Sequence, residues 1–209
     1  MNLKRLLKKQ AMKVRVFSYL YWNVYIKYIE WKRFNVSITD LGKNNVVELP
    51  KNTFSSDFRI TIRGGGGNII KVGANCQFLC TNNIYIQGDG NTVEIGDNVI
   101  FDQNVSIVLA EGTKVSIGSG CRFANGVRIR TSDQHFIYEK DGTRINYAKD
   151  VQIGNHVWLG ASCVVMKGVN IGNGTVVGMN SMVTKNIPPN SIAVGTPARV
   201  IKSNIHWIE

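Results

Sequence analysis

The second half of the chain repeats a six-residue pattern six times between residues 153 and 187. Every sixth residue is aliphatic, and a small or β-branched residue follows four places after each one. A six-residue period fits neither an amphipathic helix nor an alternating strand. It predicts short strands joined by tight turns and wound into a solenoid, whose coils bury their aliphatic edges only when they stack. The aliphatic positions are Ile153, Leu159, Val165, Ile171, Val177 and Val183.

The same register extends back to Val72 and groups the repeats in threes, so that each coil takes 18 residues in three strands. Extra residues enter only after the third strand of a coil, and the insertions number 5, 4 and 18 residues. All of them therefore leave the solenoid at one corner. Long excursions from a rigid scaffold are where binding and catalytic residues are usually placed. The longest one, residues 130–150, is the first candidate for a functional loop.

The totals fit one β-solenoid domain with two short ends. The 21 glycines among 209 residues exceed the average of about 7%, as repeated tight turns require. We expect an all-β chain with a basic, aromatic and helical segment at residues 1–35, the solenoid at 36–187 and a tail at 188–209. Residues 36–62 form an irregular first coil in this interpretation, and the four glycines at 64–67 form a turn.

Residues 1–33 carry nine Lys and Arg against one Glu, which gives +8 of the net charge of +11. They contain no Gly or Pro, and their apolar stretch is too short and too polar to span a bilayer. One or two amphipathic helices here could cap an open end of the solenoid, or anchor the protein to an anionic membrane or a membrane-bound partner. Because the basic charge is confined to this appendage, the solenoid is not predicted to bind nucleic acid.

Three of the four cysteines, Cys76, Cys121 and Cys163, fall on the inward position four places after an aliphatic residue. No pair has the CxxC spacing, and the N-terminus does not read as a signal peptide with a cleavage site. We therefore expect reduced core cysteines and a cytoplasmic protein, which would lie at the inner face of the membrane if residues 1–33 are an anchor.

Together with the repeats, three segments resemble the hexapeptide-repeat acetyltransferases. They are the loop Ser132-Asp133-Gln134-His135, the segment Ile153–Gly160 and the ending Ile187–Val200. The likeness covers residues 70–202 and is greatest to the O-acetyltransferases of sugars and of bacterial surface or capsular polysaccharides. It implies a left-handed parallel β-helix, a homotrimer, acetyl-CoA as the donor and a sugar or polysaccharide as the acceptor. It implies no metal.

Transfer of an acetyl group to a hydroxyl needs a base that takes the proton, and histidine titrates near neutral pH. His135 stands in the long loop and matches the catalytic histidine of the family, with a solvated loop residue as the alternative. His206 lies in the tail, and His156, in a repeat turn, is expected to be structural. Removal of His135 should lower the rate by roughly 10² to 10⁴.

The resemblance implies further catalytic residues. A backbone N–H in the turn Trp158–Gly160 would stabilise the oxyanion, although Gly160 could also be an ordinary turn glycine. Asp102 stands where some sugar acetyltransferases have Asn, and it would hold the acceptor unless it is a solvated carboxylate. Asp133 would fix the tautomer of His135.

Coenzyme A needs a slot for its pantetheine arm and positive charge for its phosphates. By register, Asp102, Gly160 and Gly178 form one column on a corner of the solenoid, whereas His135 leaves from a different corner. A site that contains both must therefore lie between two subunits. The coenzyme A contacts that the resemblance implies are Gly160, Ala161, Gly178, Met179, Lys185, Thr196, Pro197, Arg199 and Lys202.

Other activities remain open on this sequence. An acetyltransferase of small molecules such as antibiotics would use the same machinery with another pocket, and a scaffold without catalysis would release no thiol from acetyl-CoA. A zinc hydratase of this fold needs three convergent histidines, whereas His135 and His156 have no third partner at repeat spacing. The serine acetyltransferases carry a larger helical N-terminal part, and a membrane-embedded acyltransferase would need spanning segments.

Overall fold

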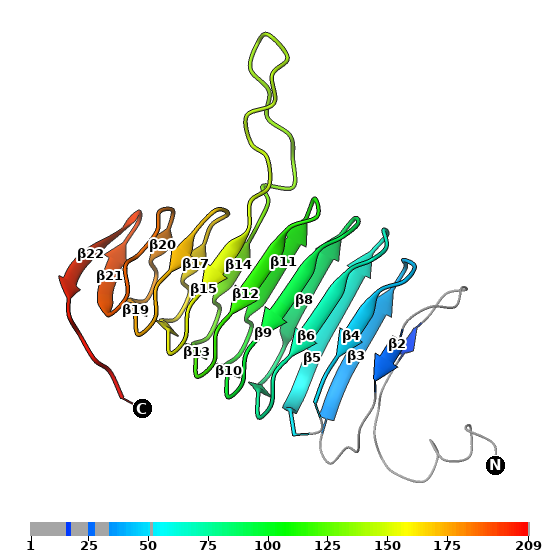
Figure 1. Ribbon diagram of the computed structural model, residues 1–209, viewed down its shortest axis with the longest axis horizontal. Helices are drawn as coiled ribbons and strands as arrows, with labels where there is room; N and C mark the ends of the chain where they lie inside the picture. The colour runs from blue at the N-terminus through cyan, green and yellow to red at the C-terminus, as the bar shows by residue number, and fades with distance from the viewer. Residues whose placement is uncertain (1–15, 18–24, 28–33, 51, 209) are drawn as a thin grey trace.

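The computed structural model describes residues 16–17, 25–27, 34–50 and 52–208. Every regular element in this part of the chain is a strand, and the strands stack into an elongated solenoid whose coils follow one another along the long axis in Figure 1. Strands of successive coils pair in parallel, and the antiparallel pair among the described strands is the hairpin at the C-terminal end. The prediction of an all-β parallel solenoid is confirmed.

Each regular coil contributes one strand to each of three faces. Face 1 contains β7 (Gln77–Phe78), β10 (Ile100–Phe101), β13 (Arg122–Phe123), β16 (Trp158–Leu159), β19 (Val176–Val177) and β21 (Ser191–Gly195). Face 2 contains β1 (Val16–Phe17), β3 (Phe34–Asp40), β5 (Phe54–Arg63), β8 (Asn82–Gln87), β11 (Ser106–Ala110), β14 (Arg128–Arg130), β17 (Val164–Val165) and β20 (Met182–Val183). Face 3 contains β2 (Tyr25–Lys27), β4 (Val46–Glu48), β6 (Ile69–Val72), β9 (Thr92–Ile95), β12 (Lys114–Ile117), β15 (Val151–Ile153) and β18 (Asn170–Ile171), and the last strand, β22 (Ala198–Ser203), folds back on β21.

The prediction of a helical segment at residues 1–35 is wrong for the residues of this range that the structure describes. Val16–Phe17 and Tyr25–Lys27 are strands that pair in parallel with β3 and β4, so they extend the sheets of the solenoid. The rest of that prediction, including both roles considered for residues 1–33, concerns residues outside the described part. Within the described ranges, no helix has the length and apolar character needed to cross a bilayer.

The inward positions predicted from the six-residue register form the core. Phe58, Phe78, Phe101 and Phe123 lie one above another in successive coils, with ring centroids 4.0, 4.6 and 5.1 Å apart. All four rings are fully buried. Since each ring contacts the ring of the next coil, the core is a continuous column that links neighbouring coils.

The cysteines follow the same register. Cys76, Cys121 and Cys163 are buried free thiols, whereas Cys80, which is off the inward position, is exposed. Burial raises the pKa of Cys76 and of Cys121 to about 11 and also raises the pKa of Cys163. These three residues are therefore core thiols, as the sequence predicted.

Three corners separate the faces, and each is a column of turns. Corner 1 follows face 1 and contains residues 79–81, 102–104, 124–126, 160–162 and 178–180. Corner 2 follows face 2 and contains residues 88–91, 111–113, 131–150, 166–169 and 184–186. Corner 3 follows face 3 and includes residues 154–157 and 172–175. The insertions predicted from the register all lie at corner 2.

A buried polar ladder supports corner 2. The amide N–H of Asn68 donates to Asn45 Oδ1 (2.9 Å), that of Asn91 to Asn68 Oδ1 (2.8 Å) and that of Thr113 to Asn91 Oδ1 (3.1 Å). The hydroxyl of Thr113 then bonds to the hydroxyl of Thr131 (2.6 Å). Buried polar groups need such partners. The ladder therefore fixes Thr131, the residue at which the longest loop leaves the solenoid.

Candidate functional site

The longest insertion, residues 131–150, projects from corner 2 far beyond the turns of the neighbouring coils (Figure 1). Most of its side chains are exposed. Exposed apolar groups gathered on one segment favour contact with another surface. The large apolar side chains of the loop that are more than half exposed are Phe136, Ile137, Tyr138, Ile145 and Tyr147.

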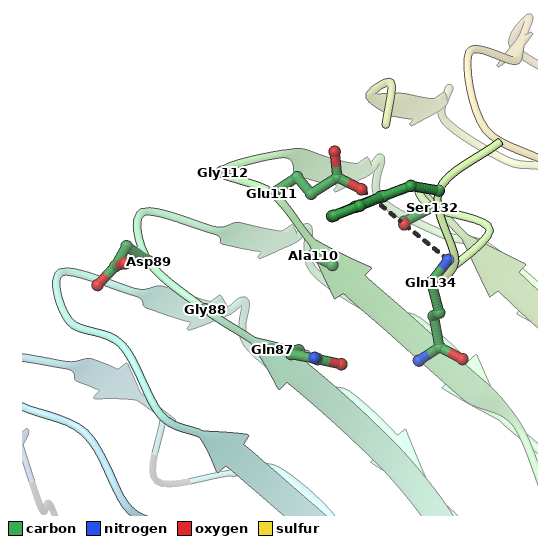
Figure 2. Close-up of a pocket in the computed structure, with 9 residues that line it drawn as sticks. Gln87, Gly88, Asp89, Ala110, Glu111, Gly112, Ser132 and Gln134 are labelled. Atoms are coloured by element: carbon green, nitrogen blue, oxygen red, sulfur yellow. Dashed lines mark hydrogen bonds between the residues drawn. The ribbon is translucent and has the colours of Figure 1, made fainter. Parts of the chain in front are cut away.

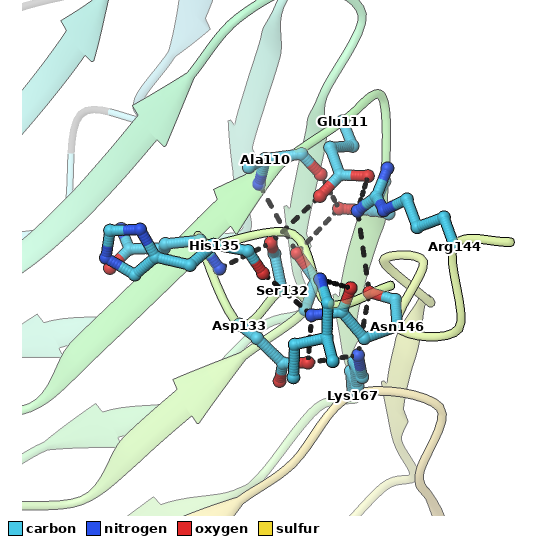
Figure 3. Close-up of polar contacts among 12 residues, drawn as sticks. Ala110, Glu111, Ser132, Asp133, His135, Arg144, Asn146 and Lys167 are labelled. Atoms are coloured by element: carbon cyan, nitrogen blue, oxygen red, sulfur yellow. Dashed lines mark hydrogen bonds and ion pairs between the residues drawn. The ribbon is translucent and has the colours of Figure 1, made fainter. Parts of the chain in front are cut away.

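Glu111, in the corner 2 turn of the coil before the loop, contacts both arms of the loop (Figure 3). Ser132 Oγ on the outgoing arm donates to Glu111 Oε1 (3.1 Å). Arg144 Nη2 on the returning arm forms an ion pair with Glu111 Oε2 (2.7 Å). One carboxylate thus joins two loop positions that are twelve residues apart.

Lys167, in the corner 2 turn of the coil after the loop, makes an equivalent pair of contacts. Its Nζ lies 2.5 Å from Asp133 Oδ2 on the outgoing arm and donates to the carbonyl of Asn146 (3.0 Å) on the returning arm. Asn146 Nδ2 also donates to Asp133 Oδ2 (2.9 Å). The hydrogen bond from Lys167 is the main cause that lowers the pKa of Asp133 below its ordinary value, so this carboxylate is ionised at neutral pH.

His135 lies on the outgoing arm, and its ring points away from Lys167 and Asn146 (Figure 3). The side chain is exposed, and the structure shows no hydrogen bond from its imidazole to any described residue. Its backbone is fixed instead, because Asn146 Nδ2 donates to the His135 carbonyl (2.7 Å) and the Ile137 N–H donates to Asn146 Oδ1 (2.7 Å). The main chain at His135 is therefore held in place, and the imidazole has no partner among the described residues.

The role predicted for Asp133 is not what the structure shows. The Asp133 carboxylate bonds to Lys167 and Asn146, and no hydrogen bond joins it to the His135 ring among the described residues. The residue pattern gave no sign of this partner, because Lys167 follows Asp133 by 34 positions. Lys167, Asn146, Glu111 and Arg144 are all residues that the sequence reasoning missed.

A surface pocket of about 520 Å³ lies beside the base of the loop (Figure 2). Turns of two successive coils form one wall, with Asp89 and Glu111 as the acidic groups, and the loop forms the other wall with Ser132, Gln134 and Phe136. Carboxylates and amides beside an aromatic ring suit a ligand with several hydroxyls, since the polar groups can bond to the hydroxyls and the ring can cover an apolar face.

Corner 1 carries the column predicted from the register. Backbone hydrogen bonds join the coils here. The Asp102 N–H donates to the Phe123 carbonyl (2.8 Å), the Ala124 N–H to the Leu159 carbonyl (2.9 Å) and the Gly160 N–H to the Val177 carbonyl (2.8 Å). Asp102, Ala124, Gly160 and Gly178 are thus stacked on one edge, as expected. The Asp102 carboxylate is half-buried, and the described residues provide it with no hydrogen-bond partner.

The two amides proposed for the oxyanion are already engaged. The Trp158 N–H donates to the Thr175 carbonyl (2.9 Å), and the Gly160 N–H to the Val177 carbonyl (2.8 Å), as parts of the inter-coil ladder. The neighbouring Ala161 N–H, in contrast, donates to no group of the described chain. Ala161 is therefore the residue of this turn that offers an unused backbone donor at corner 1.

Gly160 has a structural reason to be glycine. A Cβ at this position would lie 2.7 Å from the Met179 amide nitrogen and 2.9 Å from the Val177 carbonyl oxygen. Both atoms belong to the backbone of the next coil and cannot move independently of it. The close stacking of the two coils thus requires glycine here, whether or not a ligand also approaches.

Most residues expected to contact coenzyme A gather along corner 1 towards the C-terminal end. Ala161, Gly178 and Met179 follow one another on this corner, and Thr196 Oγ1 donates to the Asn180 carbonyl (3.2 Å). Lys185 does not join them, because it follows β20 and lies at corner 2. Pro197 lies in the hairpin turn beside Thr196, and Arg199 and Lys202 follow on β22 with exposed side chains.

His156 and Trp158 lie near corner 3, where the C-terminal tail returns to the solenoid. The ring of Trp207 stacks on His156 with centroids 3.9 Å apart and lies 5.9 Å from the Trp158 ring. His156 is thus a packing residue, as expected. Among the described residues, no group of three or more His, Cys, Asp or Glu is placed to hold a metal ion.

Comparison with known sequences gives consistent matches. A model of the family "Bacterial transferase hexapeptide (six repeats)" matches residues 150–185. The polysialic acid O-acetyltransferase of Neisseria meningitidis is 35% identical over 151 residues, which cover 62% of this chain and 69% of that protein. The galactoside O-acetyltransferase of Escherichia coli K12 is 35% identical over 113 residues, which cover 54% of this chain and 55% of that protein.

Two solved structures are similar over most of their length. The polySia-specific acetyltransferase NeuO superposes with a TM-score of 0.79 at 30% identity, covering 89% of this chain and 82% of that one. The polysialic acid O-acetyltransferase OatWY superposes with a TM-score of 0.68 at 34% identity, covering 82% of this chain and 91% of that one. The similarity therefore includes both the sequence and the arrangement of the coils.

Proposed function

Since this chain belongs to the hexapeptide-repeat O-acetyltransferase family, we propose that it transfers an acetyl group from acetyl-CoA to a hydroxyl of a sugar, with His135 as the general base. The observation that carries the proposal is the state of His135. It is the one loop histidine, its backbone is braced by Asn146 at the His135 carbonyl and at the Ile137 N–H, and its imidazole is exposed without a competing partner among the described residues. That is the condition a general base needs before its substrate arrives.

The proposed reaction uses groups from two corners. His135 takes the proton of the acceptor hydroxyl while the oxygen attacks the thioester carbonyl carbon. The Ala161 N–H donates to the oxygen that becomes negative, and the C–S bond breaks when the tetrahedral intermediate collapses. The imidazolium of His135 then returns the proton to the sulfur of coenzyme A. This assignment moves the oxyanion donor from Trp158 and Gly160, whose amides are engaged, to Ala161.

The two groups belong to different corners, so we place the active site between subunits of a homotrimer. Strand β11, which separates corner 1 from corner 2 in its coil, spans about 13 Å at about 3.3 Å per residue, and the loop then extends outward from corner 2. The exposed apolar side chains of the loop support this placement, and so do Met179 at corner 1 and Trp158 on face 1, which are 67% and 44% exposed. Contact between subunits would cover both the apolar side chains of the loop and those of Met179 and Trp158.

We propose a sugar of a bacterial surface polysaccharide, or of its precursor, as the acceptor. The pocket beside the loop, with Asp89, Gln134 and Phe136, supports a polyhydroxylated ligand. Asp102 on corner 1 is a second group available to an acceptor hydroxyl. The donor would lie along corner 1 between Ala161 and Thr196, with Arg199 and Lys202 near its phosphates.

Free thiols in the core support a cytoplasmic location. The basic charge of residues 1–33 is the reason to propose a place at the inner face of the membrane. Fractionation of cells that express the full chain, compared with a version in which the basic residues of 1–33 are neutralised, would test that location. Recovery of both forms in the soluble fraction alone would contradict the membrane part of the proposal.

The test of function is acetyl transfer by the purified full chain. Acetyl-CoA would be incubated with surface polysaccharides, their oligosaccharide fragments, simple galactosides and an aminoglycoside, and released coenzyme A would be quantified by chromatography, since the exposed Cys80 would react with thiol reagents. We expect release that depends on a saccharide acceptor and falls by roughly 10² to 10⁴ in His135→Ala. His206→Ala, in the exposed tail, is the matched histidine control. Full turnover in His135→Ala, or no release above hydrolysis with every acceptor, would overturn the proposal.

A further inference from the structure

The loop of residues 131–150 is long for a segment with so little regular structure. Loops of this length inside compact domains are usually functional or disordered, because each residue held in one conformation loses backbone entropy. Its root is held by backbone bonds from Thr131 to Val108 (3.2 Å) and from Lys149 to Thr131 (2.9 Å). These bonds fix only the two ends. The orientation of His135, further out, needs other contacts.

We infer that Glu111 and Lys167 are positioning residues that fasten this loop to the coils on either side of it, so that His135 is presented at a fixed place and angle. The inference rests on the proposed role of His135. Glu111 belongs to the coil before the loop and Lys167 to the coil after it. Each one bonds to the outgoing arm and to the returning arm at once (Figure 3).

Glu111 fastens the loop through a charged group that is itself enclosed. The Arg144 guanidinium that pairs with Glu111 lies 4.0 Å from the centre of the Phe136 ring and 4.6 Å from that of Tyr147. The side chains of Arg144 and Glu111 are 14% and 26% exposed. Ion pairs at the open surface contribute little, but charged hydrogen bonds in such partly buried sites are stronger. Removing the Glu111 charge would also leave the Arg144 guanidinium without the carboxylate that pairs with it.

Lys167 acts nearer to the histidine. It holds Asp133 and the carbonyl of Asn146, and Asn146 in turn bonds to the main chain directly after the His135 side chain, at the His135 carbonyl and the Ile137 N–H. The chain of contacts from Lys167 to His135 therefore passes through one residue. Neither Lys167 nor Glu111 bonds to the imidazole, so both act through the loop and take no part in proton transfer.

The test compares Glu111→Gln and Lys167→Met, which remove the charge and keep most of the side-chain length. Asp57→Asn is the matched control, because it removes the Asp57–Arg59 ion pair (3.0 Å) on β5, away from the loop. Hydrogen–deuterium exchange of loop peptides reports whether the loop is held, and it needs no substrate. Steady-state kinetics with acetyl-CoA and the acceptor report whether holding the loop matters for the reaction.

We expect amides of residues 134–147 to exchange at least about tenfold faster in both loop variants, with exchange elsewhere in the solenoid unchanged. We expect kcat to fall by about 10- to 100-fold with the KM for acetyl-CoA unchanged, since a displacement of about 1 Å can have that effect. The pH profile of kcat/KM should keep its shape at a lower height, and Lys167→Arg should recover most of the rate. Asp57→Asn should match wild type in all of these measurements.

Several results would overturn the inference. Exchange that accelerates without loss of kcat would show that the reaction does not need the fastening, and loss of kcat with unchanged exchange would show that the residues act in another way. A shift of the acidic limb of the kcat/KM pH profile in Glu111→Gln would show that Glu111 is itself a titrating catalytic group. A general fall in melting temperature with loss of acetyl-CoA binding would make both residues supports of the fold. If wild type acetylates none of the acceptors, the proposed function fails, and the exchange data still decide whether the loop is fastened.

Discussion

His156 and Trp207 exchange two hydrogen bonds across 51 positions of the chain. His156 Nε2 lies 3.0 Å from the Trp207 carbonyl oxygen, and Trp207 Nε1 donates to the His156 carbonyl (3.0 Å). Because a carbonyl only accepts, Nε2 must carry the proton. Together with the Ile205 N–H, which donates to the Asn190 carbonyl (3.0 Å), these bonds lay the tail along corner 3 over the last coils.

The first prediction concerns this tail. Trp207→Ala removes one hydrogen bond and the stacked ring, and it should lower the free energy of unfolding by about 1–3 kcal/mol. It should also make residues 204–208 open to proteolysis. The rate of acetyl transfer should fall, since Trp158, whose ring loses its neighbour, lies on the strand that leads directly into the turn with the Ala161 N–H. His206→Ala, next to Trp207 but exposed, should leave all three properties unchanged. Urea denaturation, limited proteolysis and turnover would be compared, and a tail that stays protected in Trp207→Ala would contradict the prediction.

The second prediction follows from the two corners. In a cyclic trimer, a site that joins the loop of one subunit to corner 1 of the next can be assembled from two different variants. His135→Ala subunits lack the base, and Gly160→Val subunits displace the turn that carries the Ala161 N–H, so each should be inactive alone. Together they should form mixed trimers in which about one of three sites is intact. Differently tagged subunits would be co-expressed and the mixed species purified, and we expect about one third of wild-type activity. Mixed trimers without activity would place both residues in the same subunit.

The third prediction concerns Gly160. Its Cβ would meet the backbone of the next coil at Met179, so Gly160→Ala should force the coils apart and lower the free energy of unfolding by about 1–3 kcal/mol. Activity should fall as well, because the Ala161 N–H is carried by the same turn. Gln103→Ala, an exposed position on the same corner, is the control and should unfold like wild type. An unchanged unfolding transition in Gly160→Ala would show that the coils tolerate the methyl group.

The register of the solenoid was predictable because burial of one side of each coil imposes a strict period. From Val72 onward, inward residues such as Phe101 and Cys121 fall where the period places them, and the insertions emerge at one corner. The coils before Val72 depart from the period, since β5 runs ten residues from face 1 into face 2. The six-residue period is therefore weak in this coil, and the sequence predicted its strands poorly.

The candidate site was predictable in part. His135 stood out because it lies where the six-residue period breaks. The column of Asp102 and Gly160 followed from their equivalent positions in the repeat. The partners of the loop were not predictable, because Glu111 and Lys167 meet it through the path of the chain in space. Nor could the period show that the amides of Trp158 and Gly160 are used by the inter-coil ladder. That result follows only from the hydrogen bonds of the stacked coils.

The last prediction concerns the buried thiols at high pH. Burial raises the pKa of Cys76 and of Cys121 to about 11, from an ordinary value near 9. Above pH 9 the unfolded chain therefore loses protons that the folded chain keeps, so stability that is present below pH 9 is lost as the pH rises towards 11. Between pH 8.5 and 10.5 the melting temperature of wild type should fall more than that of a Cys76→Ala and Cys121→Ala double variant, because the variant lacks this linkage. Lys and Tyr titrations are common to both proteins and cancel in the comparison, and equal slopes would show that the two thiols already ionise in the fold.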